Sequence, residues 1–78
     1  MYIIDEEKIN ELKEKTKTDK KNTVLECAII THMNKKEMRE YAKDLDLKLV
    51  RYERAKENNS IVLVSFLCKY RGRKIWTK

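Results

Sequence analysis

Cationic side chains are the residues of this sequence whose type and spacing suggest chemistry. Lys48, Arg51 and Arg54 recur every three residues, so on a helix they would form one ridge. The other candidates lie near the end of the sequence and at the start of a predicted helix: Arg71, Arg73, Lys74 and Lys78, and Lys35 and Lys36. Lysine neutralises a phosphate as a point charge, whereas arginine can form two parallel hydrogen bonds to a phosphate or a guanine edge. These groups therefore predict contacts with a polyanion.

The remaining polar residues give little support to catalysis. His32 is the single histidine and lies in an apolar segment, where we expect a packing role. Two cysteines and one histidine lack the spacing of a zinc site, and no glycine-rich phosphate loop is present. We therefore expect no enzyme activity, no cofactor and no metal. We expect Cys27 and Cys68 to be buried, reduced thiols.

The length, composition and net charge of the sequence indicate one small, basic domain over residues 1–78. The chain has 19 Lys and Arg against 13 Asp and Glu, a formal net charge of +6. A field of this sign attracts nucleic acid first and anionic membranes second. No apolar run is long enough to span a membrane, and Met1-Tyr-Ile-Ile is followed at once by three acidic residues, unlike a signal peptide. We expect a cytoplasmic location, or the host cytoplasm if the protein is viral.

The segment DEEKINELKEKTK, residues 5–17, predicts an N-terminal helix. Asp5 can cap it, acidic residues occupy its first turn, and lysines gather at its end. Its apolar stripe is narrow, with Ile9 and Leu12 three residues apart. The helix would therefore dock weakly on the body or pair with a second copy, which makes a homodimer through residues 2–16 an expectation to test.

Two capping-box patterns predict two further helices. TVLECAIITHM, residues 23–33, is rich in β-branched residues, as a buried strand would be, but it begins with Thr23-x-x-Glu26. We favour a helix on the strength of that start. Asn34-x-x-Glu37 then begins a helix over residues 34–46 with an apolar face of Met38, Tyr41, Ala42 and Leu45.

The end of this helix resembles the centre of a helix-turn-helix. In that family a small residue is followed by an apolar residue, a turn residue and another apolar residue, and Ala42, Leu45, Asp46 and Leu47 fill those places in order. Asp46 stands where the family usually has glycine, and aspartate tolerates the left-handed conformation better than most residues. The resemblance implies that residues 48–57 form a second helix, with Tyr52 and Ala55 on its buried side.

The last third of the chain extends this resemblance to the winged-helix family. SIVLVSFLCKY, residues 60–70, is the clearest strand, and Tyr70-Arg71-Gly72-Arg73 is a glycine-marked turn before a short strand at 74–77. In a winged helix, the 34–45 helix would support the recognition helix, and the 48–57 helix would enter the major groove of DNA. The 70–76 hairpin would contact the DNA backbone with its tip at 70–74. The implied fold is mainly α with a C-terminal β-hairpin, and residues 23–78 would hold the helix-turn-helix and wing.

An alternative architecture stays open. Glu57-Asn58-Asn59-Ser60 is suited to a tight hairpin turn, since asparagine tolerates positive φ. Residues 47–57 would then be a strand beside residues 60–70. The fold would be α+β, with helices on one face of a three-stranded antiparallel sheet.

Three hypotheses of function follow from these patterns. The first is a small basic protein that binds duplex DNA, a transcriptional regulator whose contacts are the cations named above. The second is a small viral or mobile-element inhibitor or adaptor, such as an anti-defence protein, that binds a protein or a ribonucleoprotein. The third is an RNA-binding module whose exposed sheet stacks Tyr52, Phe66, Tyr70 or Trp76 on bases.

Overall fold

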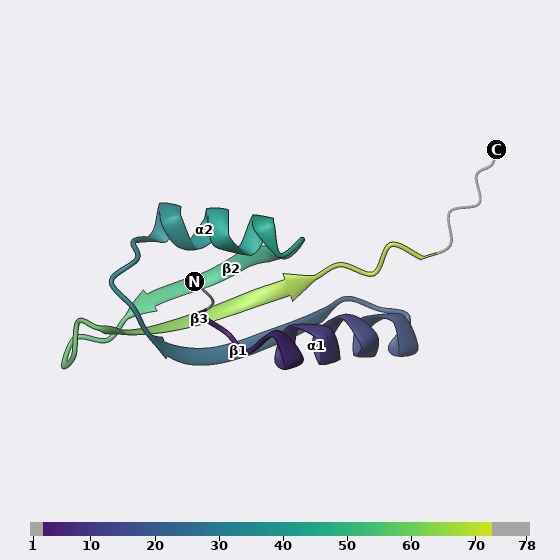
Figure 1. Ribbon diagram of the computed structural model, residues 1–78, viewed down its shortest axis with the longest axis horizontal. Coiled ribbons are helices and arrows are strands. Elements are labelled where there is room, and N and C mark those ends of the chain that lie inside the picture. Colours follow the sequence, from purple (N-terminus) through teal and green to yellow (C-terminus); the bar gives the residue numbers. More distant parts are fainter. Residues whose placement is uncertain (1–2, 73–78) are drawn as a thin grey trace.

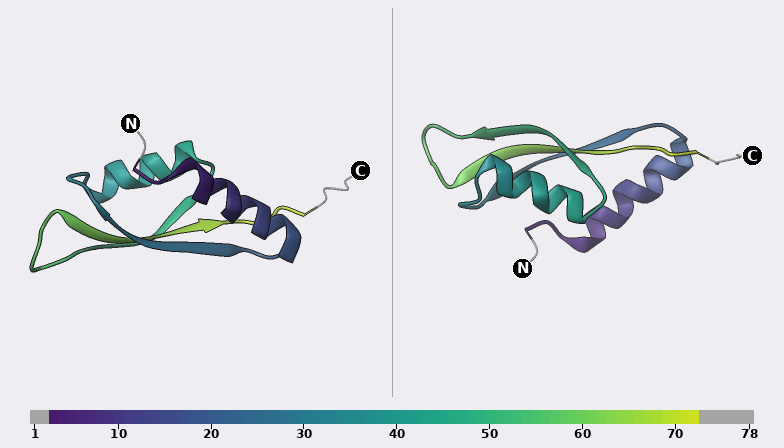
Figure 2. Two further views of the ribbon diagram at one scale, coloured as in Figure 1. Left: turned by 60° about the horizontal axis from the view of Figure 1, so that its bottom comes forward. Right: turned by 90° about the horizontal axis from the view of Figure 1, so that it is seen from above.

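The computed structural model describes residues 3–72, which fold into two helices and a three-stranded antiparallel sheet (Figure 1). The elements follow the order α1 (Glu6–Asp19), β1 (Thr23–Ile30), α2 (Lys35–Asp44), β2 (Lys48–Arg54) and β3 (Ile61–Cys68). Both helices cover the same face of the sheet (Figure 2). The α+β alternative is therefore the architecture of the chain, and the mainly α, winged-helix-like class is not confirmed.

The strand β3 lies between the other two strands and pairs with each of them in antiparallel fashion. Its pairing with β1 runs from Thr23 opposite Cys68 to Ile30 opposite Ile61. Its pairing with β2 begins at Lys48 opposite Leu67 and contains a bulge, in which Val50 is the extra residue. Because β1 and β2 are both antiparallel to β3, they are parallel to each other, and α2 connects them.

Alternate side chains of β3 form the centre of the core. Val62, Val64, Phe66 and Cys68 are buried and face the helices, where they meet Ile9 and Leu12 of α1 and Met38 and Ala42 of α2. Successive side chains of a strand point to opposite faces. Ile61, Leu63, Ser65 and Leu67 therefore lie on the other face, which neither helix covers (Figure 2).

Asp46 ends α2 and directs the chain into β2. Its φ of 63° is in the left-handed region that glycine often occupies just after a helix. The backbone N–H of Asp46 donates to the Lys43 carbonyl at 3.0 Å, and that of Leu47 donates to the Ala42 carbonyl at 2.8 Å. These two bonds form a Schellman motif. The turn predicted at Asp46 is confirmed.

Two predicted helices are wrong, because residues 23–30 form β1 and residues 48–54 form β2. Thr23 does not cap a helix; its hydroxyl contacts the Thr16 hydroxyl and lies 3.4 Å from the Leu12 carbonyl, joining α1 to the start of β1. Pairing with β3 bonds the backbone groups on one edge of each segment and packs its side chains in the sheet, and this tertiary gain exceeds the small local preference for helix. The recognition helix at 48–57 is therefore not formed.

Other predictions of local structure are confirmed. Asp5 Oδ1 accepts the Glu7 N–H at 3.1 Å, and Asn34 and Glu37 form a reciprocal capping box at 2.8 and 2.9 Å. The strand predicted at 60–70 is β3, and the turn at 57–60 is closed by the Ile61 N–H on the Asn58 carbonyl at 2.9 Å. Residues 74–77, the predicted returning strand of the wing, lie outside the described residues.

The segment before α1 is held by α2. The Tyr41 hydroxyl accepts the backbone N–H groups of Ile3 and Ile4 at 3.2 and 3.0 Å. Ile4, Ile9 and Leu12 are buried in the core of the same chain. A dimer through residues 2–16 stays a prediction, but these apolar side chains are already used inside one chain.

Truncation of β3 on its two faces should have unequal effects. We expect Val64→Ala to lower the free energy of unfolding by about 2 kcal/mol, since each buried CH₂ contributes roughly 0.8 kcal/mol and a cavity adds to the loss. Leu63→Ala removes a larger group but from a side chain that is 39% exposed, and should cost less than Val64→Ala. Urea unfolding of the two variants measures this difference, and equal losses would contradict the assignment of the faces.

Candidate nucleic-acid interface

All five elements have one terminus at the same end of the sheet. Both helices and β3 end there, and β1 and β2 begin there (Figure 1). Six cationic side chains line two adjoining hollows at this end: Lys13 and Lys17 of α1, Lys43 and Lys48 on either side of the Asp46 turn, and Lys69 and Arg71 after β3. We call this group of side chains the cationic end.

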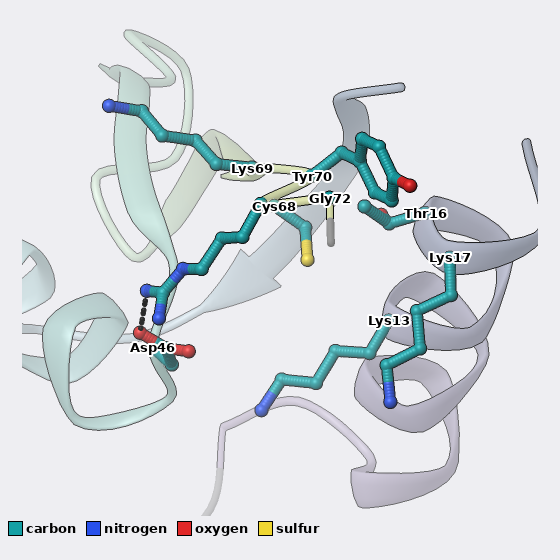
Figure 3. A pocket seen from close by; sticks show the side chains of 9 residues that line it. Lys13, Thr16, Lys17, Asp46, Cys68, Lys69, Tyr70 and Gly72 are labelled. Atoms are coloured by element: carbon teal, nitrogen blue, oxygen red, sulfur yellow. Dashed lines mark hydrogen bonds and ion pairs between the residues drawn. The ribbon is translucent and has the colours of Figure 1, made fainter. Parts of the chain in front are cut away.

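The larger hollow has a volume of about 290 Å³ and lies between α1, the Asp46 turn and residues 68–72 (Figure 3). Thr16, Cys68 and Tyr70 contribute to its wall beside the cations. A second hollow of about 170 Å³ shares Asp46, Lys69 and Arg71 with the first. Among the residues 3–72 that line the two hollows, Asp46 is the one carboxylate.

Two hydrogen bonds hold the segment after β3 against the body. The Tyr70 N–H donates to Asn22 Oδ1 at 2.8 Å, which ties the segment to the connection between α1 and β1. Arg71 Nη2 donates to Asp46 Oδ1 at 2.8 Å, which ties it to the turn after α2 (Figure 3). Both side chains of this ion pair are largely exposed, so it adds little stability. Its electrostatic effect is to offset the carboxylate and leave the surrounding lysines as an excess of positive charge.

The positions of these cations are only partly explained by helix electrostatics. A helix C-terminus carries partial negative charge and favours a nearby cation. Lys17 and Lys43 lie in the last turns of their helices and meet this preference. Lys13, Lys48 and Lys69 lie outside those turns. Their convergence needs another reason, and a bound polyanion would supply one.

Tyr70 adds an aromatic ring to the cationic end. Its side chain is partly exposed and lies beside Thr16 at the wall of the larger hollow (Figure 3). Aromatic rings next to cations are typical of surfaces that bind single-stranded nucleic acid, because every base can stack on them. Phosphate binding and base stacking are therefore both chemically available here.

Of the cations predicted from the sequence, Lys48 and Arg71 lie at the cationic end. Lys35 and Lys36 lie at the start of α2, which is at the opposite end of the sheet (Figure 1). Arg73, Lys74 and Lys78 lie outside the described residues. Lys48, Arg51 and Arg54 do not form a ridge, because β2 is extended and Arg54 points to the helix-covered face while Arg51 points to the open one.

Arg54 makes structural contacts within the chain, while its predicted binding role stays a prediction. Its guanidinium donates to the carbonyls of Thr31 at 3.2 Å and Met33 at 2.8 Å, and to the Asn59 carbonyl. It also contacts the Tyr52 hydroxyl at 2.6 Å, which itself donates to the Met33 carbonyl. Arg54 thus joins the connection after β1 to the turn between β2 and β3. Arg51 is exposed and pairs with Glu53 at 3.2 Å.

Four cations of the cationic end were missed in the sequence: Lys13, Lys17, Lys43 and Lys69. Lys13 and Lys17 are four residues apart on one helix, and this spacing was a usable signal that they share a side. No spacing in the sequence relates them to Lys69. Only the pairing of β1 with β3, which sets Thr23 opposite Cys68, brings the end of α1 beside the segment after β3.

The two cysteines are free, and Cys68 is buried while Cys27 is half-buried. Burial raises the pKa of the Cys27 thiol, and the positive charge of Lys8 opposes this effect. The thiol is therefore protonated near neutral pH and is a poor nucleophile. Within residues 3–72, no group of three or more His, Cys, Asp or Glu side chains is placed to hold a metal ion. Neither α1 nor α2 has the length and apolar character needed to cross a membrane.

Comparison with known proteins does not identify a family. No family model, curated protein or solved structure matches this chain. Function has to be inferred from the charges and contacts of the described residues.

The two arginines of β2 should differ in their effect on stability. We expect Arg54→Ala to lower the free energy of unfolding by about 2 kcal/mol, because partly buried carbonyls lose a charged donor. Arg51→Ala is the matched control and should change it by less than about 0.5 kcal/mol, since the lost ion pair is exposed. Thermal or urea unfolding gives both values. A loss for Arg51→Ala as large as that for Arg54→Ala would refute these roles.

Proposed function

We propose that the protein binds nucleic acid through the phosphate backbone at its cationic end. The observation that carries this proposal is the convergence of six cations from separate segments around two hollows that contain one carboxylate. The carboxylate is itself paired with Arg71. A polyanion with regularly spaced charges can meet several of these cations at once, and each contact releases condensed counterions.

Duplex DNA remains the first partner to test, but the proposed contact differs from that of a winged helix. Residues 48–54, which would have read base edges, form a strand in the sheet. The proposal therefore rests on phosphate contacts, which position a protein on nucleic acid without reading sequence. A transcriptional role would require a base-reading element other than this segment.

Binding of RNA or single strands would use Tyr70 rather than the aromatic residues of the sheet. Phe66 is fully buried in the core, and Tyr52 lies on the helix-covered face with its hydroxyl bonded to the Met33 carbonyl. Neither can stack on a base from an exposed sheet. Tyr70, beside Lys69 and Arg71, is an aromatic residue of the described part of the chain that lies at the cationic end, and Trp76 lies outside that part.

A second candidate function is that of an inhibitor or adaptor that binds a protein or a ribonucleoprotein. The face of the sheet that neither helix covers favours it, because Ile30 is 79% exposed and Val24 is 49% exposed there. Exposed apolar side chains on a sheet face can contribute to a protein contact. This candidate requires no affinity for free nucleic acid, so a measurement of oligonucleotide binding separates the two candidate functions.

Binding to a short duplex should depend steeply on salt. If about four phosphates are neutralised, the affinity should fall about 100-fold between roughly 50 and 200 mM salt. The double variant Lys13→Gln/Lys69→Gln should reduce the slope of log affinity against log salt by about 2, because two phosphate contacts are lost. Fluorescence anisotropy with labelled duplex and single-stranded oligonucleotides gives these slopes.

The matched control is Lys35→Gln/Lys36→Gln, which removes the same charge from exposed lysines at the other end of the sheet. It should leave the salt slope unchanged. Equal effects of the two double variants would show that only the net charge matters and would contradict a site at the cationic end. Absence of binding to every oligonucleotide at low salt would leave the adaptor as the better candidate.

A further inference from the structure

The larger hollow of the cationic end has a wall that phosphate contacts alone do not explain. Its volume is about 290 Å³, near the lower limit of small-molecule sites, which run from roughly 300 to 1,000 Å³. Cations stand around it, but Thr16, Cys68, Tyr70 and Gly72 form uncharged parts of its wall. Contact with phosphates requires cations and no such recess. The hollow therefore has space and surface for an uncharged group next to a phosphate.

We infer that the larger hollow takes one base of a single-stranded nucleic acid, with the base against the Tyr70 ring and the adjoining phosphates on the surrounding cations. The inference rests on the proposed function and narrows the polyanion to a strand with unpaired bases. A base in a duplex is stacked between its neighbours and enters a recess only by leaving the stack. A base in a single strand can turn outwards and stack on an aromatic side chain.

Tyr70 differs from the other tyrosines within residues 3–72 in the use of its hydroxyl. The Tyr41 hydroxyl binds the segment before α1, and the Tyr52 hydroxyl donates to the Met33 carbonyl. The one hydrogen bond of Tyr70 in this part of the chain is made by its backbone N–H. Its side chain is partly exposed at the wall of the hollow (Figure 3). The fold thus uses the first two hydroxyls and leaves the Tyr70 side chain free to contact a ligand.

The backbone around Tyr70 is fixed at three consecutive residues. The Tyr70 N–H donates to Asn22 Oδ1 at 2.8 Å, and Arg71 is tied to Asp46 at 2.8 Å. Gly72 has a φ of 65°, and a Cβ there would lie 3.4 Å from Cε2 of the Tyr70 ring. Glycine suits this position because it adopts a positive φ and lets the backbone pass close to the ring. A wall fixed in this way loses less conformational entropy when a ligand binds.

The lysines around the hollow are available for phosphates. Within residues 3–72, Lys13, Lys17 and Lys69 form no ion pair, whereas Arg71 is paired with Asp46. Lys13 and Lys17 come from α1, and Lys69 comes from the segment after β3 (Figure 3). The phosphates before and after an inserted base can therefore meet cations from two different segments.

The second hollow gives the strand a path beyond the first base. It shares Lys69 and Arg71 with the larger hollow and adds Lys43 and Lys48. A strand with one base in the larger hollow can pass Lys69 and Arg71 and bring its next phosphate to Lys43 and Lys48. A free nucleotide can occupy only one of the two hollows, so the arrangement favours a strand over a free nucleotide.

Base binding is tested with two oligonucleotides that have the same phosphates, a short oligothymidylate and an abasic strand of equal length. Fluorescence anisotropy at low salt gives both affinities. We expect the thymidine strand to bind about tenfold more tightly, which is within the range for stacking one base on an aromatic side chain. It should also bind more tightly than a duplex of equal length, despite the higher charge density of the duplex. Oligouridylate is measured in parallel, and the tighter of the two pyrimidine strands identifies DNA or RNA as the source.

Variants of Tyr70 assign the preference to the ring. Tyr70→Leu should remove the preference for the thymidine strand and leave the affinity for the abasic strand unchanged, because it removes the aromatic ring and no charge. Tyr70→Phe is the matched control and should keep the preference, since it retains the ring. Circular dichroism and urea unfolding confirm that both variants are folded, and the comparison of the two strands on the unaltered chain needs no variant.

The outcomes separate this inference from the proposed function. Equal affinity for the thymidine and abasic strands, or an unchanged preference in Tyr70→Leu, would overturn the base site and leave phosphate binding at the cationic end intact. Thymidine monophosphate should bind at least about 100-fold more weakly than the strand, because it reaches one hollow. A mononucleotide that binds as tightly as the strand would overturn the inference in favour of a free nucleotide. Absence of binding to every oligonucleotide would overturn the inference and the proposed function together.

Discussion

Pairing of β3 with a strand on each side is the constraint on which the rest of the structure depends. β3 carries apolar side chains on both faces. Its backbone groups need a paired strand on each edge, and its apolar side chains need cover on at least one face. The edges take β1 and β2, and the inward face takes α1 and α2 through Phe66, Val62 and Val64. Neither helix covers the outward face. The ends of the five elements then fall together, and this concentrates the cations at one end of the sheet.

The elements whose signals are local could be predicted from the sequence. Asp5, the Asn34 capping box and the left-handed Asp46 are each set by a few neighbouring residues, and each is found where expected. The two errors, at 23–33 and 48–57, have one cause. The Thr23 pattern and the Lys and Arg content favour helix by a few tenths of a kcal/mol per residue, roughly, and a full ladder with β3 outweighs this. The turn after α2 was predicted correctly, but a turn does not determine the element that follows it.

The candidate site was predictable only in part, because it is assembled by tertiary structure. The sequence predicts Lys48 and Arg71 as binding residues because each lies in a group of cations. It does not predict that Lys13 and Lys17 of α1 line the larger hollow beside Arg71. Arg54 is of a residue type that often binds phosphate, but its contacts are structural. Its guanidinium joins two loops of the same chain. A periodic set of cations therefore indicates a binding surface only when the secondary structure is known. The extended β2 divides Arg51 and Arg54 between opposite faces.

The central claim is that nucleic acid binds where the two helices and β3 end. Backbone amide shifts in an NMR titration with a short oligonucleotide at low salt test this most directly. The account predicts the largest changes at Lys13, Lys17, Lys43, Lys48 and residues 69–71, with small changes at residues 32–36 and at the 57–60 turn. Changes centred on the start of α2, or on Leu63 and its neighbours on the face that neither helix covers, would contradict it.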